Sequence, residues 1–166
     1  MKSIILVEPE IPENTGFIAR LCANFEYHLK IVNPDFNLEK ARKTASGAQK
    51  KLREARIYEK VEEAVSDVEY VVATKPERGQ SIKQFNPREN TSIMIGRESR
   101  GLSNKEIYMC DGVVHIEASE YSSLNQSHAA GILMHAFSSD PEPKGAVDFE
   151  VVEKFIEIPL LKKMIK

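Results

Sequence analysis

At the centre of the chain lies Ile93-Met94-Ile95-Gly96-Arg97-Glu98-Ser99-Arg100-Gly101-Leu102, in which a short apolar run passes directly into a charged loop that holds two glycines. An apolar run without alternation, bounded by polar residues, is typical of a strand that is buried on both faces. Gly96 stands where a ligand can approach the backbone, although the same spacing suits a tight connection between a strand and a helix. The stretch therefore predicts a buried strand with a candidate binding loop at its carboxyl end.

Similar apolar runs recur on both sides of this strand, separated by amphipathic stretches that suit helices. The predicted strands are 4–7, 29–32, 70–73, 93–95 and 113–116, and the predicted helices are 14–25, 38–55, 61–65, 104–108 and 124–137. Alternation of this kind predicts an α/β fold, with a mostly parallel sheet, helices on both faces and right-handed crossovers.

Length and composition set the scale of the protein. With 166 residues, 42% of them apolar, the chain can bury one good core. We expect one α/β domain over residues 1–140, followed by a linker and a helical tail over residues 141–166, because residues 138–145 are rich in serine and proline. The two cysteines have no metal-ligand spacing, and no apolar run is long enough to span a membrane. These features predict a cytoplasmic protein without a metal site or a membrane anchor.

The net charge limits the ways in which the protein can bind nucleic acid. The formal charge of −2 excludes a protein that binds RNA by being basic throughout, so any RNA contact needs a local patch. Residues 40–56 hold seven basic side chains against the single acid Glu54. This region, with Lys50 and Arg53 near its centre, is either a phosphate-binding patch or the solvated face of a helix.

The loop after the first predicted strand leads into a helix with an unusual arginine. Neither of the common glycine-rich nucleotide signatures is present, which disfavours dinucleotide and P-loop chemistry. Asn14 is placed to cap the helix, and Gly16 permits close backbone approach. Phe17 lies on the apolar face, whereas Arg20 lies off that face and one turn into the helix, where the macrodipole is unfavourable to a cation. An anionic partner would explain the position of Arg20.

A third polar segment, residues 121–131, runs into a helix that is rich in small residues. Small residues let a neighbouring segment pack closely. The segment contains serine and histidine, but the chain has no Gly-x-Ser-x-Gly elbow, so a serine hydrolase is disfavoured. Helix capping and packing explain the segment without any chemistry.

Taken together and in this order, the three segments resemble the SPOUT superfamily, specifically the SpoU/TrmH branch of RNA ribose 2′-O-methyltransferases. The resemblance covers residues 3 to about 137. It rests on the segments 14–20, 96–102 and 123–127, which are similar to the three motifs of that branch.

The resemblance implies a fold, a cofactor and a set of site residues. It implies a parallel α/β sheet with a C-terminal trefoil knot, S-adenosylmethionine as cofactor, tRNA as substrate, no metal, and a homodimer in which the pocket of one subunit faces Arg20 of the other. The implied catalytic residues are Arg20 and Ser123. The implied cofactor-binding residues are Thr74, Gly96, Ile116, Ser122, Ser123 and Leu124; Arg78, Lys50 and Arg53 are candidate RNA contacts, and Asn14, Glu98 and Asn125 are motif residues.

The resemblance also suggests roles and targets. An arginine side chain stays protonated at neutral pH, so we expect Arg20 to clamp an alkoxide and a phosphate instead of acting as the base. We expect Ser123 to orient the ribose hydroxyl or relay its proton, and Asn125 and Glu98 to hold the knot loops. The second and third motifs are most similar to TrmJ-type enzymes, which act on tRNA nucleotide 32, whereas residues 8–16 look like TrmL-type enzymes, which act on nucleotide 34. Methylation of rRNA and a non-catalytic RNA-binding module on the same fold are the alternatives.

Overall fold

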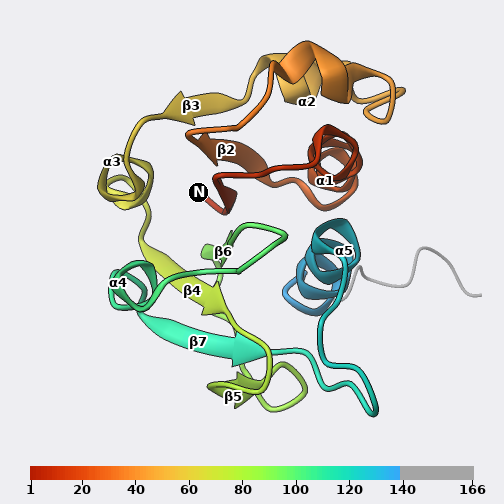
Figure 1. Cartoon of the computed structure of the whole chain (residues 1–166). Coiled ribbons are helices and arrows are strands. Elements are labelled where there is room, and N and C mark those ends of the chain that lie inside the picture. The colour runs from red at the N-terminus through yellow and green to blue at the C-terminus, as the bar shows by residue number, and fades with distance from the viewer. Residues whose placement is uncertain (139–166) are drawn as a thin grey trace, which may run out of the picture.

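The computed structural model describes residues 1–138, which form a layered α/β fold (Figure 1). The predicted tail over residues 141–166 and the predicted domain end at residue 140 lie outside the described residues. In the described part of the chain, one seven-stranded sheet has the order β3-β2-β1-β6-β4-β7-β5. Its strands are β1 (Ser3–Val7), β2 (His28–Val32), β3 (Arg56–Tyr58), β4 (Tyr70–Thr74), β5 (Gln80–Ser81), β6 (Thr91–Ile95) and β7 (Gly112–His115).

Every strand pairing within this sheet is parallel, so the predicted sheet type is confirmed. The inner strand β1 is completely buried, and Ile5 aligns with Lys30 of β2 on one side and with Met94 of β6 on the other. Two strands, β3 and β5, were not predicted. Both are short, and β3 is half exposed at the edge of the sheet, so neither has the continuous apolar run that marks a buried strand.

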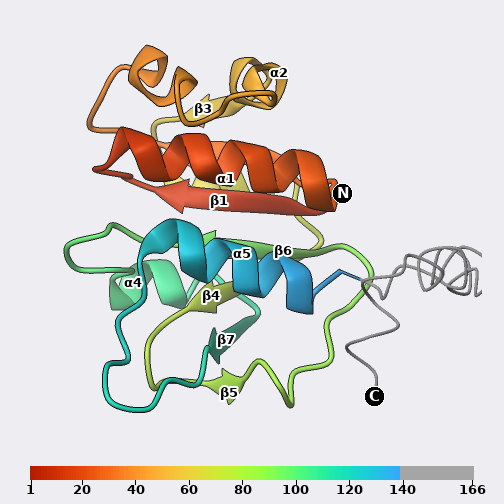
Figure 2. The same ribbon diagram turned by 90° about the vertical axis from the view of Figure 1, so that its right-hand side faces the viewer.

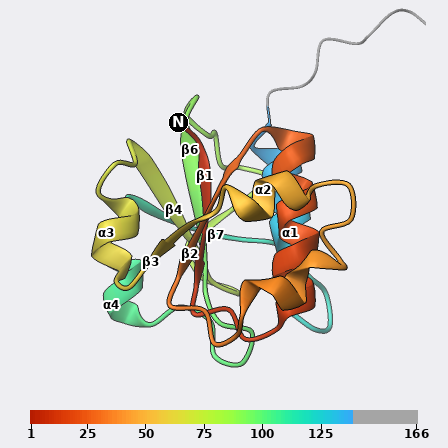
Figure 3. The same ribbon diagram turned by 90° about the horizontal axis from the view of Figure 1, so that it is seen from above.

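Helices cover both faces of the sheet, as predicted (Figure 3). The helices α1 and α5 lie side by side (Figure 2). A Cβ atom added to Gly131 of α5 would lie 3.5 Å from a methyl group of Leu21 in α1, which is an ordinary van der Waals contact between neighbouring helices. One face carries α1 (Pro12–Phe25), η1 (Leu38–Arg42), α2 (Gln49–Arg53) and α5 (Gln126–Ala136), and the other carries α3 (Val61–Val65) and α4 (Asn104–Ile107).

The continuous helix predicted over residues 38–55 is wrong. The chain forms η1 and then α2, with turns between them and a left-handed backbone at Gly47, where φ is +80°. The intervening turn packs against α1, and a Cβ atom on Gly16 would lie 2.0 Å from Thr44 Oγ1 and 2.4 Å from the carbonyl oxygen of Ala41. The close approach predicted at Gly16 is therefore confirmed, and its partner is this turn.

Helix α1 begins earlier than predicted, at Pro12, with Ile11 as its N-cap residue. Asn14 consequently lies inside the helix and is buried, so its predicted capping role is wrong. Phe17 was expected in the core but is 43% exposed. Arg20 is exposed and lies past the midpoint of the 14-residue helix. The macrodipole argument for Arg20 fails because that effect is confined to the first turn.

The connections that follow the neighbouring strands β1 and β6 leave the sheet toward opposite faces. The loop after β1 leads to α1 on one face of the sheet, and the loop after β6 leads to α4 on the other (Figure 1). Two neighbouring strands whose connections diverge in this way form the usual ligand site of an open parallel sheet.

Candidate functional site

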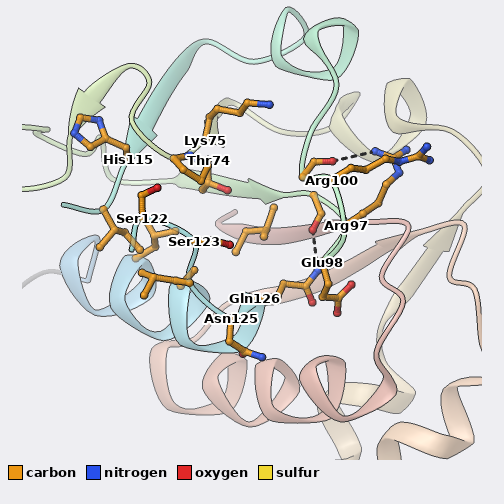
Figure 4. Close-up of a pocket in the computed structure, with 18 of the residues that line it drawn as sticks. Thr74, Lys75, Arg97, Glu98, Arg100, His115, Ser122, Ser123, Asn125 and Gln126 are labelled. Atoms are coloured by element: carbon orange, nitrogen blue, oxygen red, sulfur yellow. Dashed lines mark hydrogen bonds between the residues drawn. The ribbon is translucent and has the colours of Figure 1, made fainter. Parts of the chain in front are cut away.

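A pocket of about 600 Å³ lies at the carboxyl end of the sheet, beside the start of α5 (Figure 4). Its walls come from the ends of β4, β6 and β7 and from the loop that precedes α5. The pocket brings together residues that are far apart in the sequence, from Ile11 to Leu133. Its lining includes the segments 74–76, 95–101, 114–116 and 121–126.

The structure gathers all of the predicted cofactor-binding residues around this pocket. Glu98 and Asn125 also line it. Ser123 is exposed at the pocket wall, and its hydroxyl makes no hydrogen bond within the described residues. The six predicted cofactor-binding residues that line the pocket are Thr74, Gly96, Ile116, Ser122, Ser123 and Leu124.

Five predicted residues do not line the pocket, although one of them, Asn14, is hydrogen-bonded to the lining residues Glu98 and Asn125. Arg20 is not part of the lining. Lys50 and Arg53 are exposed on α2, at the opposite edge of the sheet from β7 (Figure 1). Arg78 is exposed after β4, where it donates a hydrogen bond to Asn104 Oδ1 at 3.1 Å. Within one chain, therefore, the predicted cofactor-binding residues lie together at the pocket, whereas Arg20, the predicted alkoxide clamp, is not part of its lining.

Gly96 is required by the loop itself. A Cβ atom at this position would lie 2.2 Å from the carbonyl carbon of Gly101 and 2.3 Å from the amide nitrogen of Leu102. The loop folds back so that Arg97 and Gly101 form an isolated antiparallel bridge, and Gly101 adopts a φ of +66°. The two glycines thus make a tight loop after β6, and its inner side forms one wall of the pocket.

Hydrogen bonds of Glu98, Asn14 and Asn125 connect the three predicted motifs. The Glu98 carboxylate accepts bonds from the amides of Glu10 and Ile11, at 2.8 and 3.3 Å, and from Asn14 Nδ2 at 3.0 Å. Asn14 Oδ1 in turn accepts a bond from Asn125 Nδ2 at 3.0 Å. These contacts join loops that are 84 and 111 residues apart in the sequence.

Asn125 also begins the helix that borders the pocket. Its Oδ1 atom accepts hydrogen bonds from the amides of Ser127 and His128, at 2.9 and 3.4 Å, which makes Asn125 the N-cap of α5. The asparagine therefore fixes both the start of α5 and, through Asn14, the position of α1. The loop that holds Ser122 and Ser123 is anchored at this end.

Arg97, which is 8% exposed, is the centre of an ion cluster that was not predicted from the sequence. Its guanidinium donates to Glu8 Oε2 at 2.6 Å and to both carboxylate oxygens of Glu106 at 2.9 and 3.0 Å. The hydrogen bonds that Arg97 donates to the two carboxylates raise its pKa above its usual range. The bond from Arg97 lowers the pKa of Glu8. The sequence Ser103-x-x-Glu106 is typical of a capping box and could have predicted that Glu106 lies in the first turn of α4.

Burial and hydrogen bonding act in opposite directions on Glu106. Burial raises its pKa, but bonds from Arg97 and from Ser103 outweigh burial and leave the pKa below its usual value. Both carboxylates of the cluster are therefore ionised at neutral pH.

A second contact joins the loop after β1 to the loop after β6. The Glu10 carboxylate accepts hydrogen bonds from the amide of Ser99 at 2.8 Å and from its hydroxyl at 2.7 Å.

Within residues 1–138, no helix is long and apolar enough to cross a membrane. The same residues contain no group of three or more histidine, cysteine, aspartate or glutamate side chains placed to hold a metal ion.

Comparison with known proteins assigns the chain to a family. The model of the SpoU rRNA Methylase family matches residues 1–135. The chain belongs to this family. Among its relatives, the tRNA (cytidine-2′-O-)-methyltransferase TrmJ of Methanocaldococcus jannaschii is 36% identical over 152 residues, covering 81% of this chain and 66% of the relative. The tRNA (cytidine(34)-2′-O)-methyltransferase of Methylovorus glucosotrophus is 30% identical over 156 residues, covering 89% of this chain and the whole relative.

Solved structures of SpoU-type proteins have the same fold. TrmJ from Z. mobilis ZM4 superposes with a TM-score of 0.74 at 26% identity, covering 99% of this chain and 86% of that one. The SpoU methyltransferase AviRb from Streptomyces viridochromogenes, in complex with AdoMet, has a TM-score of 0.71 at 24% identity, covering 82% and 56%, and shows the likeness of fold alone. This SpoU-family chain spans 58–66% of the length of the TrmJ relatives that it matches.

Proposed function

We propose that this chain is an S-adenosylmethionine-dependent tRNA ribose 2′-O-methyltransferase that acts on nucleotide 32 of the anticodon loop. The observation that carries the proposal is that the second and third motif segments line one pocket, where Asn14 of the first motif is hydrogen-bonded to both Glu98 and Asn125. Membership of the SpoU family supports the reaction class, and the names of the TrmJ relatives support tRNA as substrate. We propose that the chain acts on tRNA in the cytoplasm.

The pocket suits the proposed cofactor. Its volume of about 600 Å³ lies within the range of small-molecule sites, and apolar residues such as Ile95 and Leu133 alternate with polar ones along its walls. Two of its lining residues, His115 and Gln126, have a buried polar atom that makes no hydrogen bond within the described residues. We therefore assign the cofactor to the walls formed by Thr74, Gly96, Ile116 and the segment 122–124.

When bound, S-adenosylmethionine supplies an electrophilic methyl group on a sulfonium. The residues of the chain must then hold the ribose 2′-oxygen in line and stabilise the negative charge that develops on it. We assign this stabilisation to the guanidinium of Arg20, which also clamps a neighbouring phosphate. We assign to the hydroxyl of Ser123 the task of orienting the ribose hydroxyl or relaying its proton.

We propose that a second copy of the chain supplies Arg20. Within one chain Arg20 is exposed and outside the pocket, so the site is incomplete without a partner. The neighbouring helices α1 and α5 expose Phe17 and Ile132, at 43% and 41%, which gives them an apolar surface that a homodimer would cover. Equilibrium sedimentation tests this: the unchanged protein should have the mass of a dimer, and Phe17→Asp the mass of a monomer. A monomeric unchanged protein would contradict the dimer, and a dimeric variant would contradict the interface at α1 and α5.

We further propose that the chain passes through a trefoil knot formed by the loops around the pocket. The support is membership of the SpoU family and likeness of fold to SpoU-type structures. A crystal structure traced through residues 74–137 tests the threading directly.

The target nucleotide is tested with a tritiated-methyl assay on unmodified tRNA transcripts, followed by nuclease mapping. We expect label at nucleotide 32. Label at nucleotide 34 would assign the chain to the alternative represented by the M. glucosotrophus relative. In a parallel assay on unmodified rRNA, label there together with none on the tRNA transcripts would exclude tRNA as substrate. Binding of tRNA without methyl transfer would indicate an RNA-binding module.

The role of Arg20 predicts a separation between binding and chemistry. Arg20→Ala should reduce methyl transfer by at least about a hundredfold, because a donor aimed at the developing charge is lost, while the affinity for S-adenosylmethionine stays within about twofold. Single-turnover assays and calorimetry measure the two quantities, and Arg20→Lys is the control that keeps the charge. An equal loss of binding and transfer would contradict the clamp.

A further inference from the structure

Tyr121 is an exposed aromatic residue at the pocket that the roles assigned above do not use. It belongs to the loop between β7 and α5 and lines the pocket, yet 77% of its surface is exposed. Within residues 1–138, its ring makes no aromatic or cation–π contact. Tyr121 therefore lies at the mouth of the pocket with a ring that is open to solvent.

Position, and not exposure alone, distinguishes this tyrosine. Tyr108 is 82% exposed, but it follows α4 outside the pocket, and single exposed apolar side chains are common on protein surfaces. Tyr121 instead directly precedes Ser122 and Ser123, which line the pocket with it (Figure 4). The ring thus borders the place where the methyl group is transferred under the proposed function.

The spacing along the loop fits one nucleotide. Consecutive Cα atoms are about 3.8 Å apart, so the Cα atoms of Tyr121 and Ser123 are separated by no more than about 7.6 Å. The proposed function places the ribose of the target nucleotide at Ser123, and a base is bonded directly to its ribose. The side chain of Tyr121 is therefore long enough to reach the base of that same nucleotide.

An unstacked base is the ligand that suits this ring. RNA loops are commonly recognised through bases that leave the stack and lie on aromatic side chains. The neighbouring Glu120 is exposed and would repel a phosphate, whereas the face of a base is uncharged. Apolar cover for the adenine of the cofactor is present deeper in the pocket, at Ile95 and Leu133, which are 6% and 1% exposed. The exposed ring is therefore free for the RNA.

We infer that Tyr121 is a substrate-stacking residue: its ring stacks on the base of the nucleotide that is methylated, after that base has turned out of the anticodon loop. The inference rests on the proposed function. Stacking holds the ribose beside Ser123, and it tolerates any base because every base has an aromatic face. Tyr121 thus contributes to the position of the target nucleotide and not to the choice among bases.

The first test compares two tyrosine-to-leucine variants. Filter binding of an unmodified tRNA transcript, with S-adenosylhomocysteine present to prevent transfer, should show that Tyr121→Leu weakens binding by roughly fivefold to a hundredfold, the effect of losing one base–aromatic stack. The matched control Tyr108→Leu should bind as the unchanged protein does, and so should Tyr121→Phe, which keeps the ring. Equal affinities for the two leucine variants, or an equal loss for Tyr121→Phe and Tyr121→Leu, would overturn the inference.

An altered RNA identifies the group that contacts the ring. In an anticodon stem-loop whose target nucleotide lacks its base, the penalty of Tyr121→Leu should disappear, because no base is left to stack. A penalty that persists with the abasic RNA would show that the ring contacts another part of the RNA, and this result would also overturn the inference.

Two measurements distinguish the base from other occupants of this surface. Tyr121→Leu and the unchanged protein should have the same affinity for S-adenosylmethionine in calorimetry and the same mass in sedimentation. A loss of cofactor affinity would assign the ring to the cofactor, and a loss of mass would assign it to a contact between two copies of the chain; either result would overturn the inference. The proposed function fails separately, if the unchanged protein binds tRNA but transfers no methyl group.

Discussion

Replacement of Arg97 by methionine should destabilise the protein strongly, because it leaves the carboxylates of Glu8 and Glu106 without their guanidinium partner. Arg97 is 8% exposed, and the side chains of its partners Glu106 and Glu8 are 11% and 34% exposed. Removing one member of a buried ion pair costs about 3–5 kcal/mol, and the partial exposure of Glu8 places the expected loss near the lower end, at about 3 kcal/mol. Methionine fills a similar volume, so the loss reports the charge and its hydrogen bonds and not a cavity.

The neighbouring arginine provides a matched control. Arg100 belongs to the same loop but is 71% exposed, with one contact to Glu8 at 3.4 Å. Arg100→Met removes the same charge and should change the free energy of unfolding by less than about 0.5 kcal/mol. The double variant Arg97→Met, Glu106→Gln should recover part of the loss because the more deeply buried stranded charge is gone.

Urea denaturation followed by circular dichroism measures these differences. With a urea dependence of about 2 kcal/mol per molar, a loss of 3 kcal/mol lowers the midpoint by about 1.5 M. All variants are compared at one protein concentration, so that any association affects them equally. If Arg97→Met and Arg100→Met unfold at the same urea concentration, the ion cluster does not stabilise the fold as argued.

Three further predictions follow from the same loops. The two carboxylates paired with Arg97 have lowered pKa values, so their contribution to stability is present above the pKa of the unfolded glutamates and is lost as pH falls through the folded values. Lowering the pH should therefore reduce the free energy of unfolding more in the unchanged protein than in Arg97→Met. Parallel plots of the free energy of unfolding against pH would refute this. Gly96→Ala should weaken S-adenosylmethionine binding by about tenfold in calorimetry, because its Cβ atom would collide with the backbone at Gly101. Gly101→Ala has open space around its Cβ atom and should weaken binding less. A larger loss of affinity for Gly101→Ala than for Gly96→Ala would exclude the steric argument. Reversing the charges of Lys50 and Arg53 should lower tRNA affinity and flatten its dependence on salt, and unchanged filter-binding curves would remove α2 from the RNA surface.

Much of the fold was predictable because its signals are local. A buried parallel strand needs a short apolar run, and the runs that include Ile5, Ile31, Val72 and Ile93 were predicted as strands and are strands of one parallel sheet. The errors occurred where the local signal was weak or was overridden. The basic stretch from residue 38 to 55 has helix-forming residues, but the left-handed turn at Gly47 divides it.

The candidate site was predictable only in part. The motif residues stand out in the sequence, and the tertiary structure gathers the predicted cofactor residues around one pocket. Asn14 was misread because a polar residue near a helix start usually caps that helix, whereas here it bonds to Glu98 and Asn125. Phe17 was misread because periodicity reports an apolar face without saying what covers it.

The sequence by itself determined the class of sheet, the face that most helices bury and the loops that carry polar chemistry, because these depend on residues close together in the chain. Only the tertiary structure decided the pairing of Arg97 with Glu8, 89 residues away, and the unpaired oxygen of Gln126. The physical reason is that a hydrogen bond depends on distances of about 3 Å between atoms, and no local pattern records which distant groups the fold brings that close.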